Sequence, residues 1–360
     1  MRIVFFGQQS TIDFHQIGGV ESFIRRLAMQ LVKEGDAVDY VMFGCQETKV
    51  VTMEDGKLRL LYFKSFLRAL KALFESYDYV ITTYLHFVKR LEFLLFRFIY
   101  HKKLKFCVIL LGLPESALKR WMIFFDAKLF YEKVLVISPR LFKAARRWSL
   151  DPVLLLPPVP EDYFLRLDEK PRRKKIRLTY IGRIDVRKGI EDAIELFLKL
   201  RDHENIETQI YGYYSDFGPN SQNIYKWLKE QSQIKFVDVE QNSYTPQLEQ
   251  QIRLALKDTD VLVLPYRSID GTIDIPLLLL EGMASLCAII TTTCGDIPFI
   301  YGKSKLLLDE TSDLKHIINI LSAPSRLYAE RIRILTRNKE LKFGAKDISR
   351  LFRESLKGVK

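Results

Sequence analysis

Arg183 and Lys188 are two cations five residues apart, and a glycine stands beside each of them, at Gly182 and Gly189. The apolar residues 178–181 before them predict a short strand, and the amphipathic run after them predicts a helix. Two cations on one strand-to-helix loop can converge on a small dianion. The helix N-terminus behind them adds free N–H groups and a partial positive charge. The loop therefore favours a nucleotide diphosphate over a nucleic-acid backbone, which requires a wider spread of cations.

Glu281 is a carboxylate inside a strongly apolar run, 277–284. A buried strand is predicted to end at Pro265, and Pro276 suits the first turn of the helix that carries the carboxylate. Burying a carboxylate alone is costly, so this residue requires a partner. Two interpretations follow: a glutamate on the polar side of the helix, which spacing alone favours, or an acceptor for a pair of ligand hydroxyls.

Gly18 and Gly19 follow the first predicted strand, 2–6, and precede a predicted helix, 20–33. Paired glycines at a helix start let a ligand approach the backbone closely. Ligands of α/β domains collect at the carboxyl ends of the strands. The alternative interpretation of this pair is a flexible loop.

Strands and helices alternate along the whole chain, which predicts an α/β architecture with mostly parallel sheets. The 360 residues suffice for two domains with separate cores. Three prolines in residues 157–160 exclude a helix there, so we place the boundary at this point. The charged stretch 168–175 is expected to complete the linker, and a continuous helix is expected over 330–357.

Several classes of protein are disfavoured by composition. Hydrophobic residues make up 48% of the chain, which indicates a globular protein. The N-terminus lacks the pattern of a secretory signal, and no apolar run is long enough to span a bilayer. The cysteines, which lack metal-ligand spacing, predict reduced thiols in a cytoplasmic protein: Cys45, Cys107, Cys287 and Cys294.

The formal net charge of +12 is concentrated in the first half of the chain. Between Lys64 and Lys105, nine basic residues stand against three acidic ones, interleaved with ten aromatic residues. Within it, the run 87–103 can lie on an anionic membrane, or it can form a core helix with a solvated basic side. A second aromatic and basic stretch, 118–125, favours the membrane interpretation. Nucleic acid is disfavoured as a partner because no binding motif accompanies the charge.

Four motifs in order carry a resemblance to a known family: Gly-Gly-Val-Glu at 18–21, Gly-Arg…Lys-Gly at 182–189, Leu-Glu-Gly-Met-Ala at 280–284 and Thr-Thr-Cys-Gly-Asp-Ile-Pro at 292–298. Together they resemble a family 4 (GT4) glycosyltransferase. The resemblance implies a GT-B fold, in which two Rossmann-like domains face a cleft. It implies an acceptor-binding domain over 1–160, a nucleotide-sugar domain over 170–338, and a C-terminal helix, 339–360, that crosses back to the first domain.

The resemblance also implies a retaining transfer from a nucleotide-sugar, with no metal and no cofactor. Arg183 and Lys188 would hold the donor diphosphate, and Glu281 would accept from the ribose hydroxyls. The remaining donor contacts implied by the family pattern are Gly18, Gly19, Val239 beside the base, and Asp274, Ile275 and Leu277 beside the sugar.

Three positions depart from the family pattern. Ile273 stands where the family has a glutamate, and Asp274 beside it is expected to supply the carboxylate. Pro276 replaces a common glycine, which removes one backbone donor. Leu111 replaces a common histidine near the reacting carbon, a role for which His86 is a candidate substitute.

The function expected from these features is a cytoplasmic hexosyltransferase, peripheral on the inner face of a membrane. It would act on a glycan or a lipid-linked acceptor bound by the N-terminal domain. The departures at Ile273 and Leu111 keep open a second hypothesis, a non-catalytic partner subunit that binds a nucleotide-sugar. A third, a GT-B epimerase, is weaker because its acid and base residues find no place in this sequence.

Overall fold

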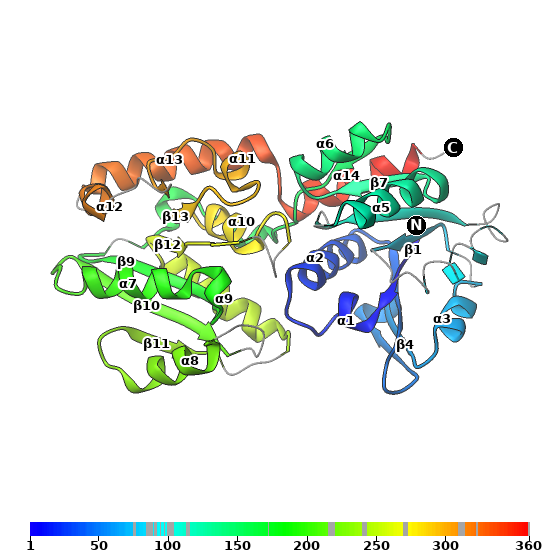
Figure 1. Cartoon of the computed structure of the whole chain (residues 1–360), viewed down its shortest axis with the longest axis horizontal. Helices are drawn as coiled ribbons and strands as arrows, with labels where there is room; N and C mark the ends of the chain where they lie inside the picture. The colour runs from blue at the N-terminus through cyan, green and yellow to red at the C-terminus, as the bar shows by residue number, and fades with distance from the viewer. Residues whose placement is uncertain are drawn as a thin grey trace. The chain divides into compact units, whose positions relative to one another are not determined.

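The chain folds into two compact units, seen in Figure 1: Met1–Pro158 with Gly344–Lys360 form unit 1, and Val159–Phe343 form unit 2. The structure, a computed structural model, describes residues 1–74, 77–83, 89, 92–93, 95–96, 98, 104–112, 116–171, 173–214, 220–239, 243–268, 273–308, 314–321 and 323–358. Both units are α/β with parallel sheets, which confirms the predicted fold class.

Unit 1 is built on an eight-stranded sheet of order β3-β4-β2-β1-β5-β6-β7-β8. Neighbouring strands are parallel except β3 and β4, which are antiparallel. The strands are β1 (Arg2–Gln8), β2 (Ala37–Phe43), β3 (Lys49–Met53), β4 (Leu58–Phe63), β5 (Tyr79–Thr82), β6 (Lys105–Leu110), β7 (Lys133–Val136) and β8 (Pro152–Leu154).

The helices of unit 1 bury one apolar side each. In α2 (Gly19–Lys33), Phe23, Leu27 and Leu31 are buried, as their spacing predicts. The other helices of this unit are α1 (Gln9–Ile12), α3 (Phe66–Ala72), α5 (Ala117–Phe130), α6 (Pro139–Arg147) and α14 (Ala345–Lys357), with a 3-10 turn, η1, at Glu54–Gly56.

Aromatic residues of the segment 64–105 contribute to the core of unit 1. Phe66, Phe93 and Phe96 belong to one buried cluster with Phe6, and the rings of Phe6 and Phe93 stack with centroids 5.3 Å apart. The prediction that the aromatics of the run 87–103 face a membrane is therefore wrong for Phe93 and Phe96. Burying these rings against the sheet removes their apolar surface from water, which stabilises the fold.

The predicted continuous helix over 330–357 is two helices, α13 (Pro324–Leu341) in unit 2 and α14 in unit 1. The first ends at Lys342, which takes a left-handed conformation with φ +50°. In α14, Phe352 is fully buried in unit 1. Arg353 on the same helix forms ion pairs with Glu34 at 2.7 Å and Asp36 at 2.8 Å, which ties α14 to the end of α2.

Unit 2 contains a six-stranded parallel sheet of order β11-β10-β9-β12-β13-β14. The strands are β9 (Ile176–Arg183), β10 (Ile206–Tyr213), β11 (Lys235–Asp238), β12 (Val261–Leu264), β13 (Ala288–Thr292) and β14 (Leu307–Leu308). Numbered within the unit this is the 3-2-1-4-5-6 order of a dinucleotide-binding fold. The strand order reverses between β9 and β12, and the loops after these two strands flank the place where such folds bind ligands.

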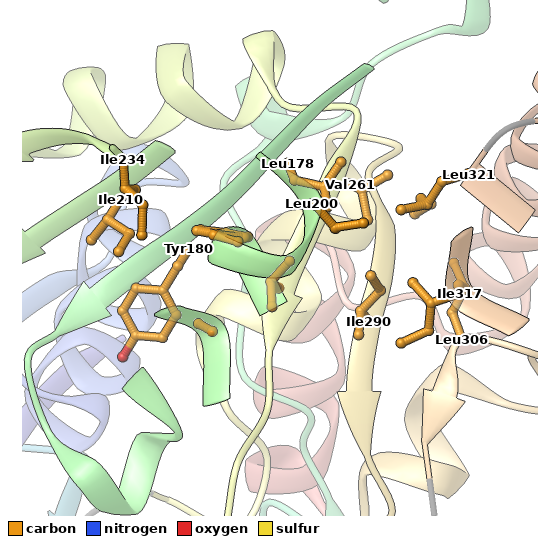
Figure 2. Close-up of a cluster of buried hydrophobic side chains, with 14 of the residues drawn as sticks. Leu178, Tyr180, Leu200, Ile210, Ile234, Val261, Ile290, Leu306, Ile317 and Leu321 are labelled. Atoms are coloured by element: carbon orange, nitrogen blue, oxygen red, sulfur yellow. The ribbon is translucent and has the colours of Figure 1, made fainter. Parts of the chain in front are cut away.

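A single apolar cluster, shown in Figure 2, joins the sheet of unit 2 to its helices. Leu178, Val261 and Ile290 come from β9, β12 and β13, and Leu200 and Leu321 reach them from helices. The helices are α7 (Ile190–Leu200), α8 (Ser221–Glu230), α9 (Pro246–Asp258), α10 (Leu277–Ala284), α11 (Ile297–Tyr301), α12 (Leu314–Leu321) and α13. Three 3-10 turns are η2 (Glu161–Tyr163), η3 (Leu167–Glu169) and η4 (Val186–Lys188).

Lys170, expected in a solvated linker, is buried in unit 2. Its ammonium donates to the carbonyl oxygens of Leu256 and Ser285, both at 2.9 Å, and lies 3.4 Å from the Cys287 sulfur. Burial lowers the pKa of Lys170. The lysine thereby links the C-terminal ends of α9 and α10 and anchors the start of unit 2.

Candidate functional site

The loop after β9, residues 182–189 and called here the cationic loop, is organised by one buried carboxylate. Asp185 accepts the backbone N–H of Arg187 at 3.0 Å and caps η4. Its oxygens also bind the Arg187 guanidinium, at 3.0 and 2.8 Å, and lie 3.4 Å from Arg183. Burial favours a higher pKa for Asp185, but the hydrogen bonds from Arg187 and the two nearby guanidinium charges lower it. An ionised Asp185 thus fixes both arginines.

Lys188 is the second predicted cation, and its side chain is partly buried at the end of η4. Burial, together with the charges of Arg183 and Arg187, lowers the pKa of Lys188 to about 8. Within the described part of the chain, its ammonium forms no ion pair and no hydrogen bond. The cationic loop thus carries three cations against the single carboxylate of Asp185, and this excess of positive charge suits an anion.

Gly189 places this charge at the start of α7. It takes a left-handed conformation, φ +75°, as the residue that precedes the helix. A Cβ atom there would lie 1.9 Å from the carbonyl oxygen of Pro265, so only glycine fits. The N-terminus of α7 and the Lys188 ammonium therefore come from consecutive residues, which combines a helix terminus with a cation.

The loop after β12 is bound directly to the cationic loop. The backbone N–H of Arg267 donates to the Arg187 carbonyl at 3.0 Å. The Arg267 guanidinium pairs with Asp192 at 2.7 Å and with Glu191 at 2.8 Å, the two acids in the first turn of α7. Arg267 thereby balances these acids, and they are not the partners of Lys188.

Glu281 is buried in α10, with an exposed fraction of 6%. Its expected place on a polar side of the helix is therefore wrong, because α10 is covered on the side that carries it. Burial and the charge of Glu281 raise the pKa of Tyr266, which begins the loop after β12. Gly282 lets α10 approach β12 closely, because a Cβ atom on this glycine would lie 2.5 Å from a methyl group of Leu262 on β12.

The residues before α10 are buried with it. Asp274 is 4% exposed, and Ile273 and Ile275 are buried on either side of it, whereas Leu277 is partly buried. Because β9 and β12 are parallel neighbours, the cationic loop and the loop that leads to Asp274 start from the same edge of the sheet. Unit 2 therefore places both predicted cations at its topological switch point, at the edge of the sheet from which the segment leading to Asp274 and Glu281 departs.

Val239 lies at the same edge but farther along it. It follows β11, the strand at the end of the sheet, and its N–H donates to the Gly212 carbonyl at 2.9 Å. One strand, β10, separates β11 from β9. Val239 is therefore separated from the cationic loop along the sheet edge, where it could contact a part of the ligand remote from the diphosphate.

In unit 1, Gly18 and Gly19 begin α2 as predicted. The carboxylate of Glu21 folds back onto this helix start, where a Cβ atom on Gly18 would lie 2.1 Å from it. Burial raises the pKa of Glu21. A carboxylate thus occupies the space beside Gly18. Leu111 is partly buried after β6, and His86 lies outside the described residues.

Three residues of this site were missed in the sequence: Asp185, Arg187 and Arg267. Asp185 and Arg187 lie between the two predicted cations, and an aspartate that begins a turn is a typical capping residue, so the signal was present for both. Arg267 is distant in sequence from the acids that it pairs with, and no local pattern identifies it.

Residues 175–323 match the family model described as Glycosyl transferases group 1. The matched segment lies within unit 2, which is therefore the part of the chain that is similar to group 1 glycosyl transferases. Solved structures resemble the whole chain: a sucrose-phosphate synthase from Thermosynechococcus elongatus has a TM-score of 0.73 at 16% identity, covering 98% of either chain. HepE from Anabaena, solved with UDP-glucose, has a TM-score of 0.69 at 11% identity, covering 99% of either chain. The lipopolysaccharide outer core galactosyltransferase WaaB has a TM-score of 0.62 at 16% identity, also covering 99% of either chain.

These likenesses confirm the GT-B fold that the sequence motifs imply. No curated protein matches the sequence. Within the described residues, no three His, Cys, Asp or Glu side chains are grouped so that they could hold a metal ion. Among its described helices, none combines the length and the apolar character needed to cross a membrane.

Proposed function

We propose that this protein is a retaining GT4 glycosyltransferase that transfers a hexose from a nucleotide-sugar to a glycan or a lipid-linked acceptor. The observation that carries the proposal is Lys188: a partly buried ammonium, with a pKa lowered to about 8, beside Arg183 and at the start of α7. Burying a charged ammonium without an anion is energetically unfavourable, and a bound diphosphate would offset this desolvation penalty.

The chemistry follows from the charges. When a nucleoside diphosphate leaves a sugar, negative charge grows on the leaving phosphate. Arg183 and Lys188, fixed by Asp185 and by the α7 terminus, would stabilise that charge in a preorganised way. We propose that this replaces a metal ion. The role of Glu281 is then to accept hydrogen bonds from the ribose, and that of Asp274 to contact the donor sugar beside Ile275 and Leu277. Val239 would border the base, and His86 would act near the reacting carbon.

The structural relatives support particular substrates. HepE was solved with UDP-glucose, and WaaB is a lipopolysaccharide outer core galactosyltransferase. On that basis we expect a UDP-hexose as donor and a membrane-borne glycan as acceptor, bound by unit 1. Action at the inner face of an anionic membrane belongs to the same proposal.

A second function, a non-catalytic partner subunit, is favoured by two positions. Ile273 is buried where the GT4 pattern has a glutamate, and Leu111 replaces a histidine. A protein of this kind binds the donor without turnover. An epimerase would instead convert the donor in the absence of any acceptor.

A donor screen tests these alternatives. Thermal unfolding is measured with UDP-, GDP- and dTDP-sugars, because a ligand that binds the native state raises the melting temperature. Release of nucleoside diphosphate is then followed with the donor that gives the largest shift, with and without glycan acceptors. Binding with turnover supports the enzyme, binding without turnover supports the partner subunit, and no shift with any donor contradicts both.

A further inference from the structure

One side of α5 in unit 1 presents an apolar stripe to solvent. Leu118, Trp121, Phe125 and Leu129 recur at helical spacing, and their side chains are 66%, 47%, 41% and 53% exposed. The rings of Trp121 and Phe125 stack with centroids 5.0 Å apart, so the stripe is an ordered surface. Isolated apolar residues are common on protein surfaces, but a continuous stripe along a helix marks an interaction site.

A groove of about 400 Å³ runs beside this stripe, between α5 and α6, which lie together in Figure 1. Its cations are Arg120 from α5 and Arg140, Lys143 and Arg147 from α6. The last three are spaced so that they share one side of the helix. None of the described residues that line the groove is acidic.

Aromatic rings form the apolar part of the groove. Phe124 and Trp148 stack with centroids 5.8 Å apart, and Trp121 belongs both to the groove and to the stripe. The groove and the stripe are therefore one continuous surface, called here the α5–α6 surface. It combines exposed aromatic rings with four cations and no acid from the described lining.

We infer that the α5–α6 surface docks the protein on a bilayer that contains anionic phospholipids. Trp121 and Phe125 would enter the interfacial layer, and the four cations would contact headgroup phosphates. The inference rests on the proposed membrane association and assigns it to a specific surface. It also moves that surface away from the segment 64–105, where Phe66, Phe93 and Phe96 belong to the core.

The combination of groups favours a bilayer over other partners. The core of a protein–protein interface is depleted of charged residues, whereas four cations here lie among the aromatic rings of the groove. Single-stranded nucleic acid also stacks on aromatic rings, but the stripe includes Leu118 and Leu129, which offer no stacking face. An aliphatic and aromatic stripe flanked by cations has the composition of an interfacial helix.

Sedimentation with vesicles tests the charge requirement. The full-length protein should bind vesicles of phosphatidylcholine mixed with phosphatidylglycerol and should not bind phosphatidylcholine alone. Lys143→Glu combined with Arg147→Glu should lower the partition coefficient by about 25-fold or more, and added salt should weaken the binding. The control, Lys226→Glu with Lys339→Glu, makes the same change in net charge at exposed positions of unit 2 and should reduce binding much less.

Tryptophan fluorescence tests the apolar requirement and the depth of insertion. A variant with Trp148→Phe and Trp227→Phe keeps Trp121 as its single tryptophan. Its emission should shift to the blue on the mixed vesicles and should be quenched by brominated lipid. Trp121→Ser with Phe125→Ser should weaken binding by about tenfold or more. These positions are exposed, and an unchanged melting temperature verifies the fold.

Three outcomes would overturn the inference: no binding to the mixed vesicles, equal losses in the unit 2 control, or unquenched Trp121 in vesicle-bound protein. Binding of a single-stranded oligonucleotide that fails in the Lys143 and Arg147 variant, with no vesicle binding, would assign the surface to nucleic acid. Because vesicles are tested without donor or acceptor, the result is independent of whether the protein transfers a sugar.

Discussion

Gly189 lies directly against Pro265: a Cβ atom on the glycine would stand 1.9 Å from the proline carbonyl oxygen. This close approach joins the loops that follow β9 and β12, the strands at the topological switch point. Both loops carry residues of the proposed donor site. The geometry of the site therefore depends on a position that has no side chain.

Gly189→Ala should destabilise the protein by about 3 kcal/mol or more, because the new methyl group meets backbone atoms and the conformation at φ +75° is strained. Chemical denaturation measures the loss. Gly35→Ala is the matched control, since Gly35 also has a positive φ, +95°, but has nothing within 4 Å of the added atom. Strain alone should cost about 1–2 kcal/mol there. Equal losses in the two variants would contradict a clash at Pro265.

Arg183→Ala and Lys188→Ala should each lower the rate of sugar transfer by roughly 10²–10³-fold, because each removes a cation from the leaving diphosphate. The measurement is kcat/KM for the donor found in the thermal screen. Arg201→Ala, at the far end of α7, is the control and should leave the rate unchanged. Full activity in the Lys188 variant would disprove the proposed role of the cationic loop.

The donor kcat/KM should fall as the pH rises through about 8, where free Lys188 loses its proton. Lys188→Arg should remove this fall, because a guanidinium remains charged over that range. Activity is measured across the range with both proteins. A pH profile that is the same in both would assign the fall to another group.

Lys188→Met should raise the melting temperature at neutral pH although it impairs catalysis. The pKa of Lys188 is lower in the folded protein than its ordinary value of 10.5. Between pH values of about 8 and 10.5 the unfolded chain therefore binds more protons at this lysine than the folded protein does. Stability from this group consequently rises with pH between about 8 and 10.5, and at pH 7 its charge opposes folding. Differential scanning calorimetry at pH 7 checks the sign. A melting temperature below that of the native protein contradicts it.

Asp185→Asn should weaken the fold by about 1–3 kcal/mol, because the amide replaces a carboxylate that binds Arg187 and faces Arg183. The charge of Asp185 also raises the pKa of Lys188, so its loss should move the fall in kcat/KM below pH 8. Asp192→Asn is the control, since its pair with Arg267 is exposed and contributes little. An unchanged pH profile in the Asp185 variant would show that the two groups are not coupled.

The cationic loop could be predicted from the sequence because its information is local. A strand, two cations, two glycines and a helix follow within a short segment, and the structure places them at one edge of the sheet. The burial of Glu281 was harder to predict. Helical spacing gives the side of a helix but not what covers it, and the sequence does not reveal that α10 packs closely on β12 at Gly282.

Residues that act through distant partners could not be predicted. Lys170 is surrounded by acceptors from residues 256, 285 and 287, so nothing near it in the sequence distinguishes it from a solvated linker lysine. Phe66 and Phe93 posed a similar difficulty, because an aromatic and basic segment fits a core helix as well as a membrane surface. The sheet of unit 1 decides between these alternatives.

The last helix of the chain has a consequence for synthesis on the ribosome. Because α14 belongs to unit 1, all of unit 2 emerges before the segment that completes unit 1 has been translated. Unit 2 can fold while it is still tethered, whereas Phe352 and Arg353 can reach their places in unit 1 only after residues 344–358 have been translated. Nascent unit 1 thus spends the longest time incomplete, although it is the first to be made.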